Sequence, residues 1–130
     1  MLLSCDWKAV GPDLPRDLVK KALAISGLFD LDAIRRTPFL QSDLKLTPAS
    51  VRKLSPAGFP TPHGTLVAVA GGDESEEFLR QTQLIQKQWG RKTVPVSEAL
   101  PGLNHFSVLH DLVDPDTRLN ELARQLLGLA

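Results

Sequence analysis

The chain has 130 residues, of which 42% are hydrophobic and 23% charged, and its 15 basic residues balance 15 acidic ones. This length fits one domain with one core. Zero formal charge, no tyrosine and 5% aromatic residues argue against nucleic acid or an anionic membrane as a partner, because such partners need basic surfaces or stacking side chains. The single cysteine, Cys5, excludes an internal disulfide, and no apolar run reaches the ~20 residues of a membrane helix. We therefore expect a soluble, cytoplasmic protein.

One strand is predicted in the first quarter of the chain. In residues 1–7, Met1, Leu2, Leu3 and Trp7 are apolar and no capping residue precedes them, a pattern typical of the end of a helix. Residues 19–26 contain the continuous apolar run Ala22–Ile25, which favours a strand buried on both faces, as in a parallel sheet. A short helix is predicted over residues 28–36.

The next segment, residues 37–64, reads as mostly irregular. Residues 37–46 have mixed polarity and no period, and residues 57–64 are rich in proline and glycine, which predicts a loop. Between them, Thr47 suits the N-cap and Pro48 the first position of a short helix that ends near residue 54.

A second buried strand is predicted over residues 65–70, ending at the pair Gly71-Gly72. A helix is expected from about residue 74 to residue 89, with Gly90 just after its end. Its apolar stripe, which we expect to face a sheet, consists of Phe78, Thr82, Ile85 and Trp89.

The third strand is predicted over residues 92–97, and because Pro95 cannot donate a ladder hydrogen bond this strand should lie at an edge. Asp114 and Pro115 are expected to open the last helix as its N-cap and first residue. The buried stripe of that helix is predicted to be Leu119, Leu122, Ala123 and Leu126.

Strands that alternate with helical segments predict an α/β fold, with about three parallel strands and flanking helices. Ligands of such sheets bind at the carboxyl ends of the strands. The segment 71–75 and the loop that contains His105 both follow strands, so this edge is where we expect a functional site.

Glu74 is the candidate acid and His105 the candidate base of that site. A buried carboxylate can accept the Nδ1 proton of a histidine and fix its tautomer, so that the imidazole can move a proton to and from a nucleophile. The structural alternative is that Asp73 caps the following helix with Glu76 as its partner, and that His105 is a packed loop residue. Asp73 is also the alternative acid.

The other groups that could carry chemistry are weaker candidates. His110 is expected to face solvent and His63 to lie in a structural loop, so neither predicts a metal site, and Gly71-Gly72 alone does not predict a phosphate or cofactor site. No G-x-S-x-G motif occurs in the 130 residues, so the nucleophile is absent from the expected place. Ser4 and Cys5 have no flanking glycines, and Ser26 follows a strand but has Ala24 two positions before it.

Taken in order, these motifs resemble the C-terminal half of α/β-hydrolases of the kynurenine formamidase and related carboxylesterase group. Four stretches carry the resemblance, which covers essentially the whole chain. They look like the sixth strand with its exit, the substrate-side cap, the acid loop with its helix, and the histidine loop: Ile25–Leu31, Leu44–Thr47 with Leu54–Pro56, Gly71–Gln81, and Asn104–Leu109.

The resemblance implies a role for particular positions. In the family the acid stands three residues after the first glycine, which selects Glu74 over Asp73, and the base is His105. Residues 37–64 would form a cap-like segment of a single truncated domain over residues 1–130. Residues 1–7 look like the end of the helix that follows the nucleophile, so the serine elbow, the oxyanion loop and the first five strands would precede this sequence.

Two kinds of function follow as hypotheses. The first is hydrolysis of an ester or an N-formyl amide without any cofactor or metal, by an external serine with His105 and Glu74, so that this chain by itself would be inactive. The second is a non-catalytic remnant or a small α/β binding domain. Because an unpaired apolar strand invites association, we also expect a homodimer through the first strand or an apolar face.

Overall fold

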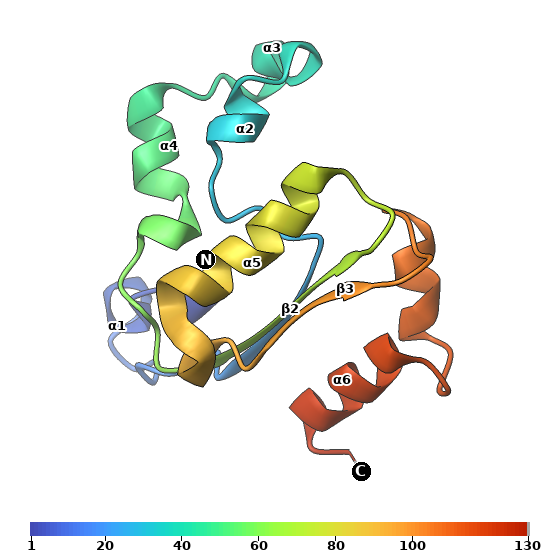
Figure 1. The fold of residues 1–130 in the computed structure, drawn as a ribbon. Helices are drawn as coiled ribbons and strands as arrows, with labels where there is room; N and C mark the ends of the chain where they lie inside the picture. The colour runs from blue at the N-terminus through green and yellow to red at the C-terminus, as the bar shows by residue number, and fades with distance from the viewer. Residues whose placement is uncertain (130) are drawn as a thin grey trace.

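The computed structural model describes residues 1–129 and has the predicted α/β architecture. Three parallel strands form one sheet in the order β1-β2-β3, as Figure 1 shows. Their bounds are Lys21–Ile25 for β1, Thr65–Gly71 for β2 and Val96–Leu100 for β3. The first two predicted strands are confirmed, and β3 is an edge strand as expected, with Pro95 immediately before it.

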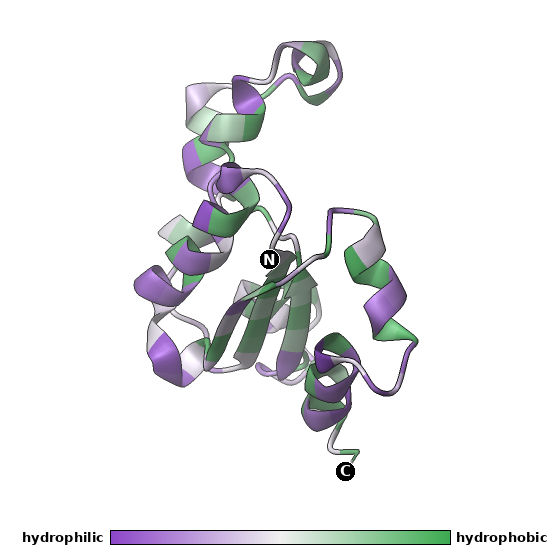
Figure 2. Cartoon of the chain, turned by 45° about the vertical axis from the view of Figure 1, so that its right-hand side comes forward, coloured by the Kyte–Doolittle hydropathy of each residue, from purple (hydrophilic) through white to green (hydrophobic). Residues whose placement is uncertain are grey.

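Helices cover both faces of the sheet, so the central strand β2 is buried throughout. Leu66 and Ala68 point toward α5 (Glu76–Thr93), where they join a core with Ile85 and Trp89. The alternate residues of β2 pack on the other side against α6 (Arg118–Leu127) and the 3-10 helix η4 (Ser107–Leu112) in a second core that includes Val67, Val69, Val108, Leu119 and Leu122. Figure 2 shows the apolar strands between these two layers.

The connection from β1 to β2 contains five short helical segments, and Figure 1 shows α2, α3 and α4 at the upper left, on the side of the sheet where α5 lies. The predicted cap is present: the Thr47 hydroxyl accepts a hydrogen bond from the Ser50 amide, and Pro48 is the first residue of α4. The segments are α2 (Asp32–Arg35), η2 (Pro38–Leu40), α3 (Gln41–Leu44), α4 (Pro48–Leu54) and η3 (Pro56–Gly58).

Residues 38–44 are helical, so the prediction of an irregular segment over 37–46 is wrong. Each of these turns spans three or four residues, which is too short for the 3.6-residue periodicity by which a helix is recognised in sequence. The turn of α3 stops at Lys45, whose φ of 47° is left-handed.

The N-terminal segment is not the end of a longer helix as the sequence indicated. A single 3-10 turn, η1 (Leu2–Ser4), is followed by the separate helix α1 (Trp7–Val10). The carboxylate of Asp6 caps α1 by accepting a hydrogen bond from the Ala9 amide. Asp6 therefore begins a helix within a stretch that was expected to finish one.

Helix α5 begins and ends later than predicted. Its N-cap is Ser75, so the expected capping role of Asp73 is wrong, and Glu74 lies in the turn before the helix. Gly90 has the predicted left-handed φ, at 78°, but one further helical turn follows it to Thr93. That extra turn uses the residues expected to begin β3, which explains why β3 starts at Val96.

The last helix also begins later than the sequence indicated. The carboxylate of Asp114 accepts a hydrogen bond from the Asp116 amide and forms a local turn, while Thr117 caps α6 by accepting from the Asn120 amide. Two candidate caps three residues apart compete, and the tertiary position of η4 selects the second. Within residues 1–129, no helix is long and apolar enough to cross a membrane.

Candidate active site

The candidate site lies where the loops after β2 and β3 meet at the carboxyl edge of the sheet. The Gly72 amide donates to the Leu100 carbonyl (2.6 Å), and the Asp73 amide donates to the Leu103 carbonyl (3.0 Å). A Cβ atom on Gly71 would collide with the same Leu103 carbonyl. Glycine at this position therefore permits the two loops to approach.

Glu74 and His105, 31 positions apart in the chain, meet at this edge. Oε2 of Glu74 lies 2.7 Å from Nδ1 of His105. The Glu74 side chain is fully covered, whereas 49% of the His105 side chain is exposed. Asp73, the alternative acid, is exposed and takes part in the loop contact through its amide.

Two further donors hold the other oxygen of the Glu74 carboxylate. Oε1 accepts from the Ser26 hydroxyl at 2.5 Å and from the Gly71 amide at 2.7 Å. Burial by itself raises the pKa of Glu74, but the hydrogen bonds from Ser26, His105 and Gly71 outweigh it and leave the pKa below its ordinary value. Glu74 is therefore ionised at neutral pH.

An ionised carboxylate can only accept hydrogen bonds, so Nδ1 of His105 carries the shared proton. The opposite nitrogen, Nε2, is then the basic one. Two aromatic rings flank the imidazole: Phe78 stacks on it with a centroid distance of 4.7 Å and a tilt of 30°, and Phe106 meets it edge-on at 5.6 Å. These contacts and the bond to Glu74 fix the ring with a half-exposed face.

The loop that carries His105 is built by local hydrogen bonds. The side-chain oxygen of Asn104 accepts from the amides of Phe106 and Ser107, and the Ser107 hydroxyl accepts from the Asn104 amide. Val108, completely buried in the second core, anchors the end of the loop. His105 is thus presented by a rigid turn.

Ser26 is the site residue that the sequence identified least well. As a candidate nucleophile it was set aside because Ala24, and not a glycine, stands two positions before it, and its hydroxyl donates to Glu74. Across residues 1–129, no serine hydroxyl is hydrogen-bonded to His105. Ser4 and Cys5, the other two candidates, line a different hollow together with His63.

An apolar pocket of about 370 Å³ opens beside the imidazole. Phe78 connects the pocket with the imidazole, because it lines the pocket and its ring also stacks on His105. The sequence placed Phe78 on the stripe facing the sheet, whereas it lies in the first turn of α5, beside the pocket. The remaining lining residues are Leu28, Ala33, Ile34, Thr37, Phe39, Leu40, Ser75 and Glu77.

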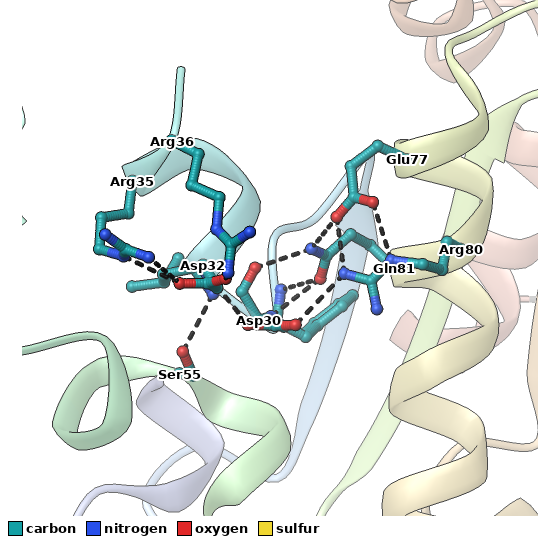
Figure 3. A network of polar contacts seen from close by, with 10 residues as sticks. Asp30, Asp32, Arg35, Arg36, Ser55, Glu77, Arg80 and Gln81 are labelled. Carbon is teal, nitrogen blue, oxygen red and sulfur yellow. Dashed lines mark hydrogen bonds and ion pairs between the residues drawn. The ribbon is translucent and has the colours of Figure 1, made fainter. Parts of the chain in front are cut away.

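A buried glutamine on α5 fixes the segment after β1 that borders this pocket, as Figure 3 shows. Oε1 of Gln81 accepts from the amides of Phe29 and Asp30, both at 2.8 Å, and its Nε2 donates to the Asp30 carbonyl and to Glu77, both at 2.7 Å. Arg80 completes the network by pairing with Glu77 and Asp30. Gln81 could not be identified from the sequence, because a polar side chain between Arg80 and Thr82 carries no signal of burial.

The described residues contain no group of three or more His, Cys, Asp or Glu side chains that could hold a metal ion. His63 and His110 are both exposed, and neither lies beside the Glu74–His105 pair. With Nδ1 bonded to Glu74, the imidazole of His105 is oriented so that Nε2 can accept and return a proton.

Curated proteins show what this chain is similar to. It is 31% identical over 138 residues to a kynurenine formamidase of Danio rerio and 27% identical over 140 residues to one of Salmo salar. The chain is similar to kynurenine formamidases. Each match takes in 98% of this chain but 45% of the relative, so the chain spans about half the length of the curated relatives it matches. No protein-family model and no solved structure matches it.

Proposed function

We propose that this chain carries the acid and the base of a serine hydrolase that acts on an ester or an N-formyl amide. The observation that carries the proposal is the fully covered, ionised carboxylate of Glu74 at 2.7 Å from Nδ1 of His105. The similarity to kynurenine formamidases supports the same reaction class.

In this proposal His105 acts twice. Its Nε2 takes the proton of a serine hydroxyl as the serine attacks the substrate carbonyl, and then returns that proton to the leaving group. Glu74 keeps the proton of Nδ1 in place and stabilises the imidazolium while it exists. The serine and the oxyanion donors would lie outside these 130 residues, since the sequence contains no G-x-S-x-G motif.

The pocket beside Phe78 is the proposed place for the apolar part of the substrate. Its lining is almost entirely apolar, and its volume of about 370 Å³ falls within the range of small-molecule sites. Phe78 would touch both the bound group and the imidazole, which supports this pocket as the place for an aryl or acyl group. A neutral, apolar acyl or aryl group fits this lining best.

The chain without a nucleophile should be inactive. Loss of a triad nucleophile costs several orders of magnitude in rate, so we expect no serine-hydrolase activity of the isolated chain on p-nitrophenyl acetate. Measured activity that disappears in His105→Ala would show instead that the chain contains its own nucleophile.

A chimera tests the acid–base assignment directly. This chain would replace the matching segment, 45% of the length of the Danio rerio relative, and hydrolysis of an aryl formamide would be followed. We expect an active chimera whose kcat/KM falls by about 10³-fold or more in His105→Ala and in Glu74→Ala, with His110→Ala as the exposed control. A folded, active chimera insensitive to His105→Ala would contradict the assignment.

A specific observation favours a second, non-catalytic role as an oligomerising domain. Strand β1 is an edge strand, and within residues 1–129 its outer side pairs with no other strand. Its apolar residues are half-buried, and the adjacent hollow is lined by Ala22, Leu23, Ala123, Leu126 and Leu127. We propose that two copies associate through this edge as a homodimer.

A further inference from the structure

We infer that Ser26 is a positioning residue of the Glu74–His105 pair: its hydroxyl holds the Glu74 carboxylate with Oε2 directed at the imidazole. The inference rests on the proposed acid–base role of that pair. The Ser26 hydroxyl is hydrogen-bonded to Glu74 and not to His105, and Ser26 does not line the pocket, so it would act through Glu74.

The backbone at Ser26 is in an unusual conformation. Its amide donates to the Val69 carbonyl at 2.8 Å, which continues the ladder between β1 and β2, yet its φ of 52° lies in the left-handed region. A residue with a Cβ atom is strained in this region, whereas glycine reaches it freely. The backbone conformation alone therefore favours glycine at this position. Serine differs from glycine by supplying the hydroxyl that binds Glu74.

The hydroxyl completes the constraint on the carboxylate. The Gly71 amide bonds Oε1 at 2.7 Å and fixes the position of that oxygen, but the carboxylate plane can still turn about it. Ser26 approaches the same oxygen at 2.5 Å from a neighbouring strand, and two donors on Oε1 leave Oε2 for Nδ1 of His105. All three donors reach a side chain that is fully covered, where water cannot replace a lost bond.

The tautomer of His105 reports this positioning directly. With Oε2 in place, the proton is held on Nδ1; a carboxylate that turns away releases this preference. We would label histidine with ¹⁵N in the full chain and measure the Nδ1–H to Nε2–H ratio at neutral pH, without substrate. In Ser26→Gly, which suits the left-handed φ, we expect the ratio to fall several-fold and the Nδ1 proton to exchange faster with water.

Double substitution separates an effect through Glu74 from a general disturbance. Glu74→Gln should lower the same ratio, and Ser26→Gly added to Glu74→Gln should lower it no further, because coupled residues are not additive. Ser42→Gly, an equivalent change at an exposed serine of α3, should leave the ratio at the wild-type value. If Ser26→Gly does not fold, Ser26→Ala removes the same hydroxyl and retains the Cβ atom.

An unchanged tautomer ratio in a folded Ser26 variant would overturn the inference, whatever the chimera does. A lowered ratio together with an inactive chimera would instead count against the proposed hydrolase function and leave the role of Ser26 in holding Glu74 intact. The two proposals therefore fail through different measurements.

Discussion

Glu74 combines complete burial of its side chain with hydrogen bonds to both carboxylate oxygens. The same residue type two positions later, Glu76, is exposed on the first turn of α5. Glutamate suits the site because its carboxylate reaches back from the turn before α5 to the end of β2, while Asp73 is exposed and turns its amide to the Leu103 carbonyl. The position of Glu74 in the turn, more than its residue type, explains why it contacts His105 and Asp73 does not.

The lowered pKa of Glu74 makes the stability of the fold depend on pH. Because its folded-state pKa lies below the ordinary glutamate value, the carboxylate stabilises the fold above that ordinary value, and the contribution is lost as the pH falls toward the folded-state pKa. Glu74→Gln should lower the free energy of unfolding at pH 7 by about 1–3 kcal/mol. Urea unfolding should show a smaller difference from wild type at about pH 3, below the ordinary value.

Glu76→Gln is the matched control for this measurement. Its carboxylate is exposed, so the free energy of unfolding should change by less than about 0.5 kcal/mol at both pH values. An equal loss at pH 7 and pH 3 in Glu74→Gln would show that the contribution of this side chain does not depend on the charge of the carboxylate.

At the scale of elements, α5 connects the site to the rest of the fold. Ile85 and Trp89 bury its later turns against β2, as the apolar spacing predicted. Gln81, one turn earlier, binds the backbone after β1. Phe78, in the first turn, stacks on the imidazole of His105. The apolar periodicity predicted that the helix packs on the sheet, but it did not predict the contacts of Phe78 and Gln81, the two residues nearest the site.

Gln81→Met should be strongly destabilising despite being a volume-conserving, helix-compatible change. It would leave the buried amide of Phe29 and the amide and carbonyl of Asp30 without the Gln81 partner. Each buried polar group left unpaired costs about 1–3 kcal/mol, so we expect a loss of about 2–5 kcal/mol in the free energy of unfolding. Chemical denaturation measures this directly.

Gln83→Met provides the comparison on the same helix, because Gln83 is exposed. We expect a change of less than about 0.5 kcal/mol. Similar small losses in both variants would mean that the segment after β1 is held by its apolar contacts, and the network of Figure 3 would then be a surface feature of little energetic weight.

At the scale of the whole molecule, the sheet is unevenly covered. Helix α5 packs on β2 and β3, and α6 lies beside β1, but no strand among residues 1–129 pairs with the outer edge of β1. Leu127, 74% exposed at the end of α6, lines the hollow next to that edge. This is the surface through which we expect two copies to associate.

Light scattering across micromolar concentrations should therefore give the mass of a dimer. Leu127→Glu places a charge on the proposed interface and should shift the equilibrium to monomer by about tenfold or more. Val113→Glu alters a side chain that is 82% exposed after η4 and should leave the dimer intact. A wild-type chain that stays monomeric at all of these concentrations would contradict the proposed homodimer.

The sequence by itself determined the features that local patterns encode. Continuous apolar runs identified β1 and β2, turn chemistry located the start of α4, and the alternation of strands and helices predicted the parallel sheet, all of which depend on residues close together in the chain. The order of the acid and histidine loops, with the family resemblance, pointed to Glu74 and His105. The start of α5 and of α6 escaped prediction because several nearby residues could serve as caps.

Only the tertiary structure decided which side chains complete the site. Ser26 and Glu74 are 48 positions apart, and Gln81 and Phe29 are 52 apart, so no local spacing relates them. Their contacts arise because parallel strands bring successive carboxyl ends to one edge of the sheet. Packing there excludes water, and burial turns a serine hydroxyl and a glutamine amide from ordinary polar groups into required hydrogen-bond partners.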